Sequence, residues 1–140
     1  MTAYVDSSVL LRLVLQQSNR LSEWDNVTRP VTSRLSEVEC LRTLDRLRLD
    51  EMLDDLGLAK NRRALDQLAR QLDFIELTRP VLSRAGGPMP TRLRTLEAIH
   101  LASALQWRSS RKESIVMATH DRALGIAARA SGLEVVGVIF

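Results

Sequence analysis

Short apolar runs alternate with longer stretches of helical periodicity along this chain. The apolar runs predict five strands, at residues 2–5, 30–33, 73–77, 114–118 and 133–138. Apolar residues that recur every three or four positions predict helices between them, at about 9–14, 35–49, 52–72, 95–107 and 121–130. Repeated alternation of strand and helix is typical of a mostly parallel sheet with helices on both faces. The pattern therefore predicts an α/β fold with three layers, α/β/α.

Polar residues near the helix starts give candidate caps. Ser7 or Ser8 is expected to cap the first helix, and Ser36 with Glu39 has the spacing of a capping box for the second. The third helix is expected to be interrupted at Gly57, and the glycines and prolines of residues 85–90 predict a loop.

The helix predicted at 95–107 is apolar around most of its circumference, which places it in the interior. Its polar positions form one stripe: Glu97, His100, Ser103 and Gln106. A polar stripe on a buried helix is expected to face a pocket.

Composition limits the class of protein. A chain of 140 residues with 45% hydrophobic content is expected to form one domain, 1–140, with its own core. One cysteine, Cys40, cannot form an internal bridge and favours a reducing, cytoplasmic location, and no signal peptide or membrane-spanning run is recognisable. Only two of the 20 basic residues, Lys60 and Lys112, are lysines, and an arginine excess permits a nucleic-acid partner without identifying one.

Four carboxylates stand beside apolar runs: Asp6, Glu39, Glu97 and Asp121. Because the carboxyl ends of parallel strands share one edge of a sheet, we expect one acidic pocket there. Gathered carboxylates repel one another and need a cation, and their oxygens suit Mg²⁺ or Mn²⁺. Glycine-rich nucleotide loops and zinc-type Cys or His pairs are absent from the sequence, which argues against nucleotide and zinc enzymes.

The carboxylates fit a hydrolase that activates water with a divalent ion and attacks a phosphodiester. Periodicity leaves the second acid open, because the apolar face of the helix at 35–49 lies closer to Glu37 than to Glu39. A phospho-acceptor domain would need paired acids after the first strand, but Asp6 is followed by Ser7.

Several of these segments carry a family resemblance. They are Tyr4-Val5-Asp6-Ser7-Ser8, Val38-Glu39-Cys40-Leu41-Arg42, the run from Leu93 to Ala104, and Ala118-Thr119-His120-Asp121-Arg122-Ala123-Leu124. In this order they resemble the signatures of PIN-domain ribonucleases, and most of all the VapC toxins of toxin–antitoxin pairs. The resemblance implies a PIN-like α/β/α fold and an Mg²⁺- or Mn²⁺-dependent endoribonuclease.

Within that resemblance, Asp6, Glu39, Glu97 and Asp121 take the positions of the catalytic metal ligands, and Glu39 is preferred over Glu37. Ser8 and Thr119 take positions next to the first acid, where they would support it from behind. Glu97 departs from the family, which usually has aspartate there. Its side chain is longer by one carbon–carbon bond, about 1.5 Å, which is expected to alter metal geometry or preference.

The resemblance also implies partners: an RNA substrate, a VapB-like antitoxin and a second copy of the chain in a homodimer. A different interpretation stays open. The chain could be a PIN-fold binding module with weakened catalysis, which captures an antitoxin or RNA without cleaving it.

Overall fold

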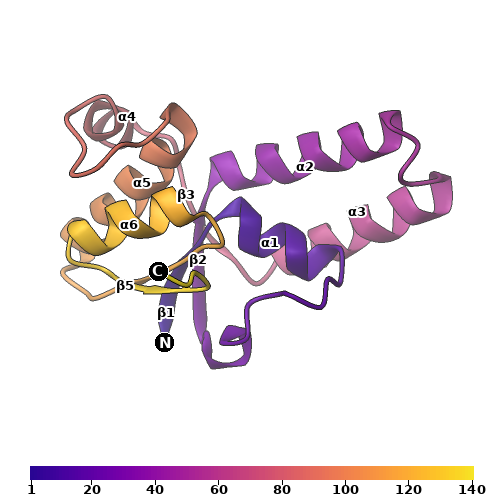
Figure 1. Ribbon diagram of the computed structural model, residues 1–140, viewed down its shortest axis with the longest axis horizontal. Helices are drawn as coiled ribbons and strands as arrows, with labels where there is room; N and C mark the ends of the chain where they lie inside the picture. Colours follow the sequence, from indigo (N-terminus) through magenta and orange to yellow (C-terminus); the bar gives the residue numbers. More distant parts are fainter.

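The computed structural model describes residues 1–140 as three layers with a parallel sheet in the middle (Figure 1). Its five strands lie in the order β3-β2-β1-β4-β5, and every neighbouring pair is parallel. They are β1 (Thr2–Val5), β2 (Arg29–Ser33), β3 (Asp73–Ile75), β4 (Val116–Ala118) and β5 (Glu134–Val136). The predicted α/β/α class and parallel sheet are confirmed.

Six α-helices cover the two faces of the sheet (Figure 1). One face carries α1 (Ser7–Val14), α2 (Arg34–Leu49) and α3 (Asp55–Ala69), and the other carries α4 (Arg79–Ala85), α5 (Thr95–Arg111) and α6 (Arg122–Ala130). A short 3₁₀ turn, η1 (Trp24–Asn26), lies in the connection between α1 and β2. No helix is long and apolar enough to cross a membrane.

Strand β1 separates two hydrophobic cores because its side chains alternate between faces. Ala3 and Val5 belong to the core under α1 and α2, whereas Tyr4 belongs to the core under α5 and α6. All three are fully buried. A tyrosine in this position must find a partner for its hydroxyl group inside the protein.

The helices after β1 and β4 leave the sheet on opposite faces, although these strands are neighbours. The backbone N–H of Asp6 extends the pairing of the two strands by donating to the carbonyl oxygen of Ala118 at 3.2 Å. Such a switch point opens a crevice at the carboxyl ends of the strands, where open α/β sheets bind their ligands. The fold therefore places Asp6 and the segment after Ala118 at this switch point, which is called the crevice from here on.

The helix caps differ from the sequence-based expectations. Asp6 itself caps α1, because its side chain accepts from the N–H of Val9, so the expected cap at Ser7 or Ser8 is wrong. Ser33 caps α2 by accepting from Leu35, so Ser36 and Glu39 do not form a capping box.

Two helices also differ from expectation. Helix α3 continues through Gly57 without interruption, since Asp54 caps it and accepts from the N–H of Gly57 at 2.7 Å. Helix α4 was not predicted, although Thr78 before Pro80 is a typical helix start.

Gly137 is the glycine on which the crevice most depends. Its φ is +93°, and a Cβ added there would lie 2.5 Å from the backbone oxygen of Thr119. Gly137→Ala should therefore lower the free energy of unfolding by about 1–3 kcal/mol, measured by urea denaturation. Gly86→Ala is the matched control, because its nearest contact would be an ordinary 3.6 Å. Equal stability of the two variants would contradict this account of Gly137.

Candidate active site

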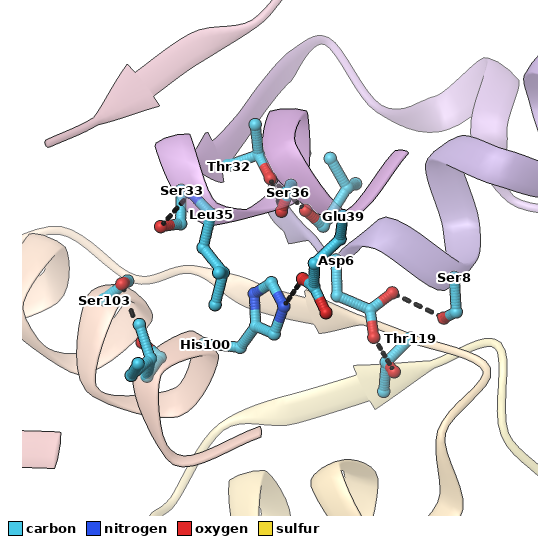
Figure 2. Close-up of polar contacts among 12 residues, drawn as sticks. Asp6, Ser8, Thr32, Ser33, Leu35, Ser36, Glu39, His100, Ser103 and Thr119 are labelled. Carbon is cyan, nitrogen blue, oxygen red and sulfur yellow. Dashed lines mark hydrogen bonds and ion pairs between the residues drawn. The ribbon is translucent and has the colours of Figure 1, made fainter. Parts of the chain in front are cut away.

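Asp6 is the buried centre of the crevice between β1 and β4. Its residue is 3% exposed, and Figure 2 shows both carboxylate oxygens in hydrogen bonds. Oδ1 accepts from the Ser8 hydroxyl at 2.5 Å and from the N–H of Val9 at 3.2 Å, while Oδ2 accepts from the Thr119 hydroxyl at 2.5 Å. Every partner is a donor, as an ionised carboxylate requires. The carboxylate is thereby fixed in one orientation.

The same two hydroxyl groups hold the segment between β4 and α6. The Ser8 oxygen accepts from the backbone N–H of His120 at 2.9 Å, and the Thr119 oxygen accepts from that of Asp121 at 2.9 Å. Each hydroxyl thus donates to Asp6 and accepts from this segment. The geometry gives Ser8 and Thr119 one shared task, which is to join Asp6 to the start of α6.

Asp121 lies at the N-terminus of α6 as its cap. Its Oδ1 accepts from the N–H of Leu124 at 2.9 Å, and its own N–H is bound by Thr119. The favourable end of the helix dipole stabilises a negative charge at this position. Asp6 and Asp121 are therefore two helix caps connected through one threonine.

Glu39 approaches the sheet from α2 and binds a histidine of α5. The Nε2 atom of His100 lies 2.6 Å from Glu39 Oε1, and its Nδ1 lies 2.7 Å from the hydroxyl oxygen of Tyr4 (Figure 2 shows the first contact). The pKa of Tyr4 is raised well above its usual value, first by burial and then by the negative charges of Asp6 and Glu39.

Glu37 lies elsewhere on α2. It is 3.6 Å from Arg34 and lines an apolar hollow between α2 and α3 together with Leu41 and Arg62. Of the two glutamates, Glu39 is the one that contacts the polar stripe of α5.

Glu97 lies in the first turn of α5, three residues before His100 and so on the same helix face. Its Oε2 atom is buried and has no hydrogen-bond partner. A buried carboxylate oxygen without a partner is costly, and a divalent cation is a group that would satisfy it. The oxygen donors of the four acids also match the preference of Mg²⁺ and Mn²⁺.

The structure joins the four predicted acids in two pairs. Asp6 and Asp121 are connected through Thr119, and Glu39 is held by His100, one turn of α5 from Glu97. In this conformation no group of three or more acidic, histidine or cysteine side chains is arranged to hold an ion. An ion shared by all four acids would require side-chain rotation.

Tyr4 is a site residue that the sequence reasoning missed. A tyrosine in a fully buried strand, two residues before a strand-end acid, was the available signal. The other histidine, His120, lies with Nδ1 2.9 Å from the carbonyl oxygen of Gly137 and does not contact the carboxylates.

Cys40 lies directly after Glu39 and is fully buried. Burial, followed by the charges of Glu39 and Asp6, raises the pKa of its thiol to about 12. Because the thiolate is the reactive form, this cysteine is a core residue and not a nucleophile.

Comparisons with known proteins agree with the fold and show the family. The family model of the PIN domain matches residues 3–130. Ribonuclease VapC46 of Mycobacterium tuberculosis is 32% identical over 136 residues, which cover 95% of each chain. Ribonuclease VapC35 of the same species is 33% identical over 138 residues, covering 95% of this chain and 94% of that protein. The crystal structure of PAE2754 from Pyrobaculum aerophilum superposes with a TM-score of 0.59 at 20% identity, over 96% of this chain and 84% of that one.

The raised pKa of Cys40 gives a direct test of its environment. In the folded protein at pH 8 we expect no reaction with a thiol-specific disulfide reagent over the time in which a free cysteine reacts fully, since almost no thiolate is present. In guanidinium the same cysteine should react at once. Rapid labelling of the folded protein would show that the thiol is accessible and ionised.

Proposed function

Because the chain belongs to the PIN-domain family, we propose that it is a metal-dependent endoribonuclease and the toxin of a toxin–antitoxin pair. The relatives named as VapC ribonucleases support this activity over nearly the full chain. The observation that carries the proposal is the fixed carboxylate of Asp6 at the switch point of the sheet, joined to Asp121 through Thr119.

The residues that would hold Mg²⁺ or Mn²⁺ are Asp6, Glu39, Glu97 and Asp121. When bound, such a cation supplies activation of water and stabilisation of the charge that develops on a phosphodiester. Asp6 would contribute an oriented carboxylate, because the hydroxyl groups of Ser8 and Thr119 each donate a hydrogen bond to one of its oxygens. Glu97 would contribute its unpartnered Oε2, and Asp121 would add negative charge from the start of α6.

RNA is the proposed substrate, a VapB-like antitoxin the proposed inhibitor, and a homodimer the proposed assembly. The names of the relatives support the first two. The excess of arginine over lysine supports an RNA partner, because guanidinium groups bind phosphate oxygens in pairs.

One observation favours a second candidate, a binding module without cleavage. In this conformation no group of three metal-ligating side chains is assembled. Under this alternative the crevice would serve binding alone. Cleavage of RNA by the purified protein, strictly dependent on added metal, separates the two candidates.

Three aspartates of this chain are helix caps, which allows a matched comparison: Asp6, Asp121 and Asp54. Asparagine caps helices about as well as aspartate, so each Asp→Asn change should keep its helix. Asp6→Asn also replaces one accepting oxygen with a donor that faces Ser8 or Thr119, so this variant should be folded but less stable. Asp6→Asn and Asp121→Asn remove charge from the proposed metal site and should lower the cleavage rate by about 100-fold or more. Asp54→Asn caps α3 elsewhere and should cleave like the unaltered protein.

The measurement is cleavage of a labelled pool of random single-stranded RNA with 2 to 5 mM Mn²⁺, about the level that saturates a weak site, with circular dichroism to confirm folding. Full activity in Asp6→Asn would remove this residue from the mechanism. Equal losses in all three variants would indicate damage to the helices instead.

The length of the Glu97 side chain is expected to influence which metal ion supports cleavage. Mg²⁺ tolerates little departure from octahedral geometry, so a glutamate in this position should favour Mn²⁺. Glu97→Asp should then raise the Mg²⁺-supported rate relative to the Mn²⁺-supported rate. Glu113→Asp is a control for the same change at an exposed surface position. An unchanged or lower ratio of the two rates in Glu97→Asp would contradict the proposed effect of length.

A further inference from the structure

Tyr4, His100 and Glu39 form an unbroken chain of hydrogen bonds across the three layers. Tyr4 comes from β1, His100 from α5 and Glu39 from α2. The two contacts measure 2.7 Å and 2.6 Å. Exposure rises along the chain: Tyr4 is fully buried, and the side chains of His100 and Glu39 are 4% and 23% exposed. The buried end therefore anchors a carboxylate that reaches solvent.

The direction of these bonds follows from the groups involved. An ionised carboxylate only accepts, so Nε2 of His100 carries the proton that lies between it and Glu39. In the neutral ring Nδ1 is then an acceptor, and the hydroxyl of Tyr4 donates to it. All three groups are satisfied by this single arrangement.

His100 has no ring nitrogen left for a metal ion in this arrangement, because Tyr4 occupies one and Glu39 the other. His100 therefore supports the Glu39 carboxylate and is not itself a metal ligand. Only Oε1 of Glu39 takes part in this contact.

We propose that His100, supported by Tyr4, is a positioning residue that fixes Glu39 for binding of Mg²⁺ or Mn²⁺ through one carboxylate oxygen. The inference rests on the proposed function, since it assigns Glu39 to the metal site. A partly exposed glutamate otherwise samples many rotamers, and ordering it at the moment of binding weakens affinity. Removing a residue that forms a hydrogen bond with a metal ligand usually lowers the metal affinity or the activity 10- to 100-fold.

The competing explanation is that these bonds only stabilise the fold. A buried hydroxyl that forms no hydrogen bond with any of the four acids provides the control: the Thr32 oxygen lies 2.6 Å from the carbonyl oxygen of Val5 and 2.7 Å from Ser36 Oγ. Thr32→Val keeps the shape and removes these bonds. It should lower the melting temperature without changing metal affinity.

The test measures the dissociation constant for Mn²⁺ by electron paramagnetic resonance, and the melting temperature, in four variants. His100→Leu removes both bonds and should weaken Mn²⁺ binding about 10- to 100-fold. His100→Gln keeps a donor that can reach Glu39 and should recover affinity to within about threefold of the unaltered protein. Tyr4→Phe removes only the far hydroxyl and should give a smaller loss, about three- to tenfold. Thr32→Val is the control.

A second measurement uses the metal-free protein and does not depend on whether His100→Leu folds. In the metal-free protein, ¹⁵N chemical shifts of the His100 ring should identify the form in which Nε2 carries a proton. A ring protonated at Nδ1 alone in the unaltered protein would leave Glu39 without a donor and would overturn the proposal.

Other outcomes separate this inference from the proposed function. If the unaltered protein binds no Mn²⁺ at millimolar concentration, the metal-dependent function fails and the inference fails with it. If the unaltered protein binds Mn²⁺ and Asp6→Asn does not, the metal site stands. In that case, an unchanged Mn²⁺ affinity in both Tyr4→Phe and His100→Leu would overturn the role of His100 alone. A loss of Mn²⁺ affinity in His100→Leu that His100→Gln does not recover would do the same.

Discussion

The burial of the Asp6 carboxylate is the constraint on which the crevice depends. A carboxylate that is 3% exposed must have donors for both oxygens, and the fold supplies two hydroxyl groups and one backbone N–H. Because Ser8 and Thr119 also accept from the segment that follows β4, the same requirement fixes the start of α6. One buried charge thus sets the relative position of two neighbouring strands and of the helices that leave them on opposite faces.

The two pairs of acids differ in how they are held. Asp6 and Asp121 have short side chains at strand ends, and both are tied to backbone as helix caps. Glu39 and Glu97 come from helices on opposite faces of the sheet, and in this conformation only Glu39 makes a hydrogen bond across it, to His100. The three-layer arrangement is therefore what allows helices α2 and α5 to meet there, and His100 is the contact between them.

The alternation of strands and helices, and the positions of Asp6 and Asp121 after strands, could be predicted from sequence because both follow local rules. The failures at Glu39 and Tyr4 concern long-range partners. Ser36 and Glu39 have capping-box spacing, but Thr32 binds the serine and His100, 61 residues away, binds the glutamate. Tyr4 was overlooked for the same reason, since its partner lies 96 residues away. A sequence pattern indicates which hydrogen bonds are possible between neighbouring residues. It does not show whether a residue from another layer of the fold will form the bond instead.

Glu97 and His100 lie on one face of the same helix, and this limits how the longer acid can be accommodated. A shift of α5 away from the crevice would make room for the extra methylene of Glu97, but it would also lengthen the 2.6 Å contact between His100 and Glu39. That contact weakens steeply with distance, and α5 is packed through Leu101, Ala104 and Trp107 into the core. In the proposed metal site the added length would then be absorbed by rotation of the Glu97 side chain, whose Oε2 is buried and has no partner in this conformation.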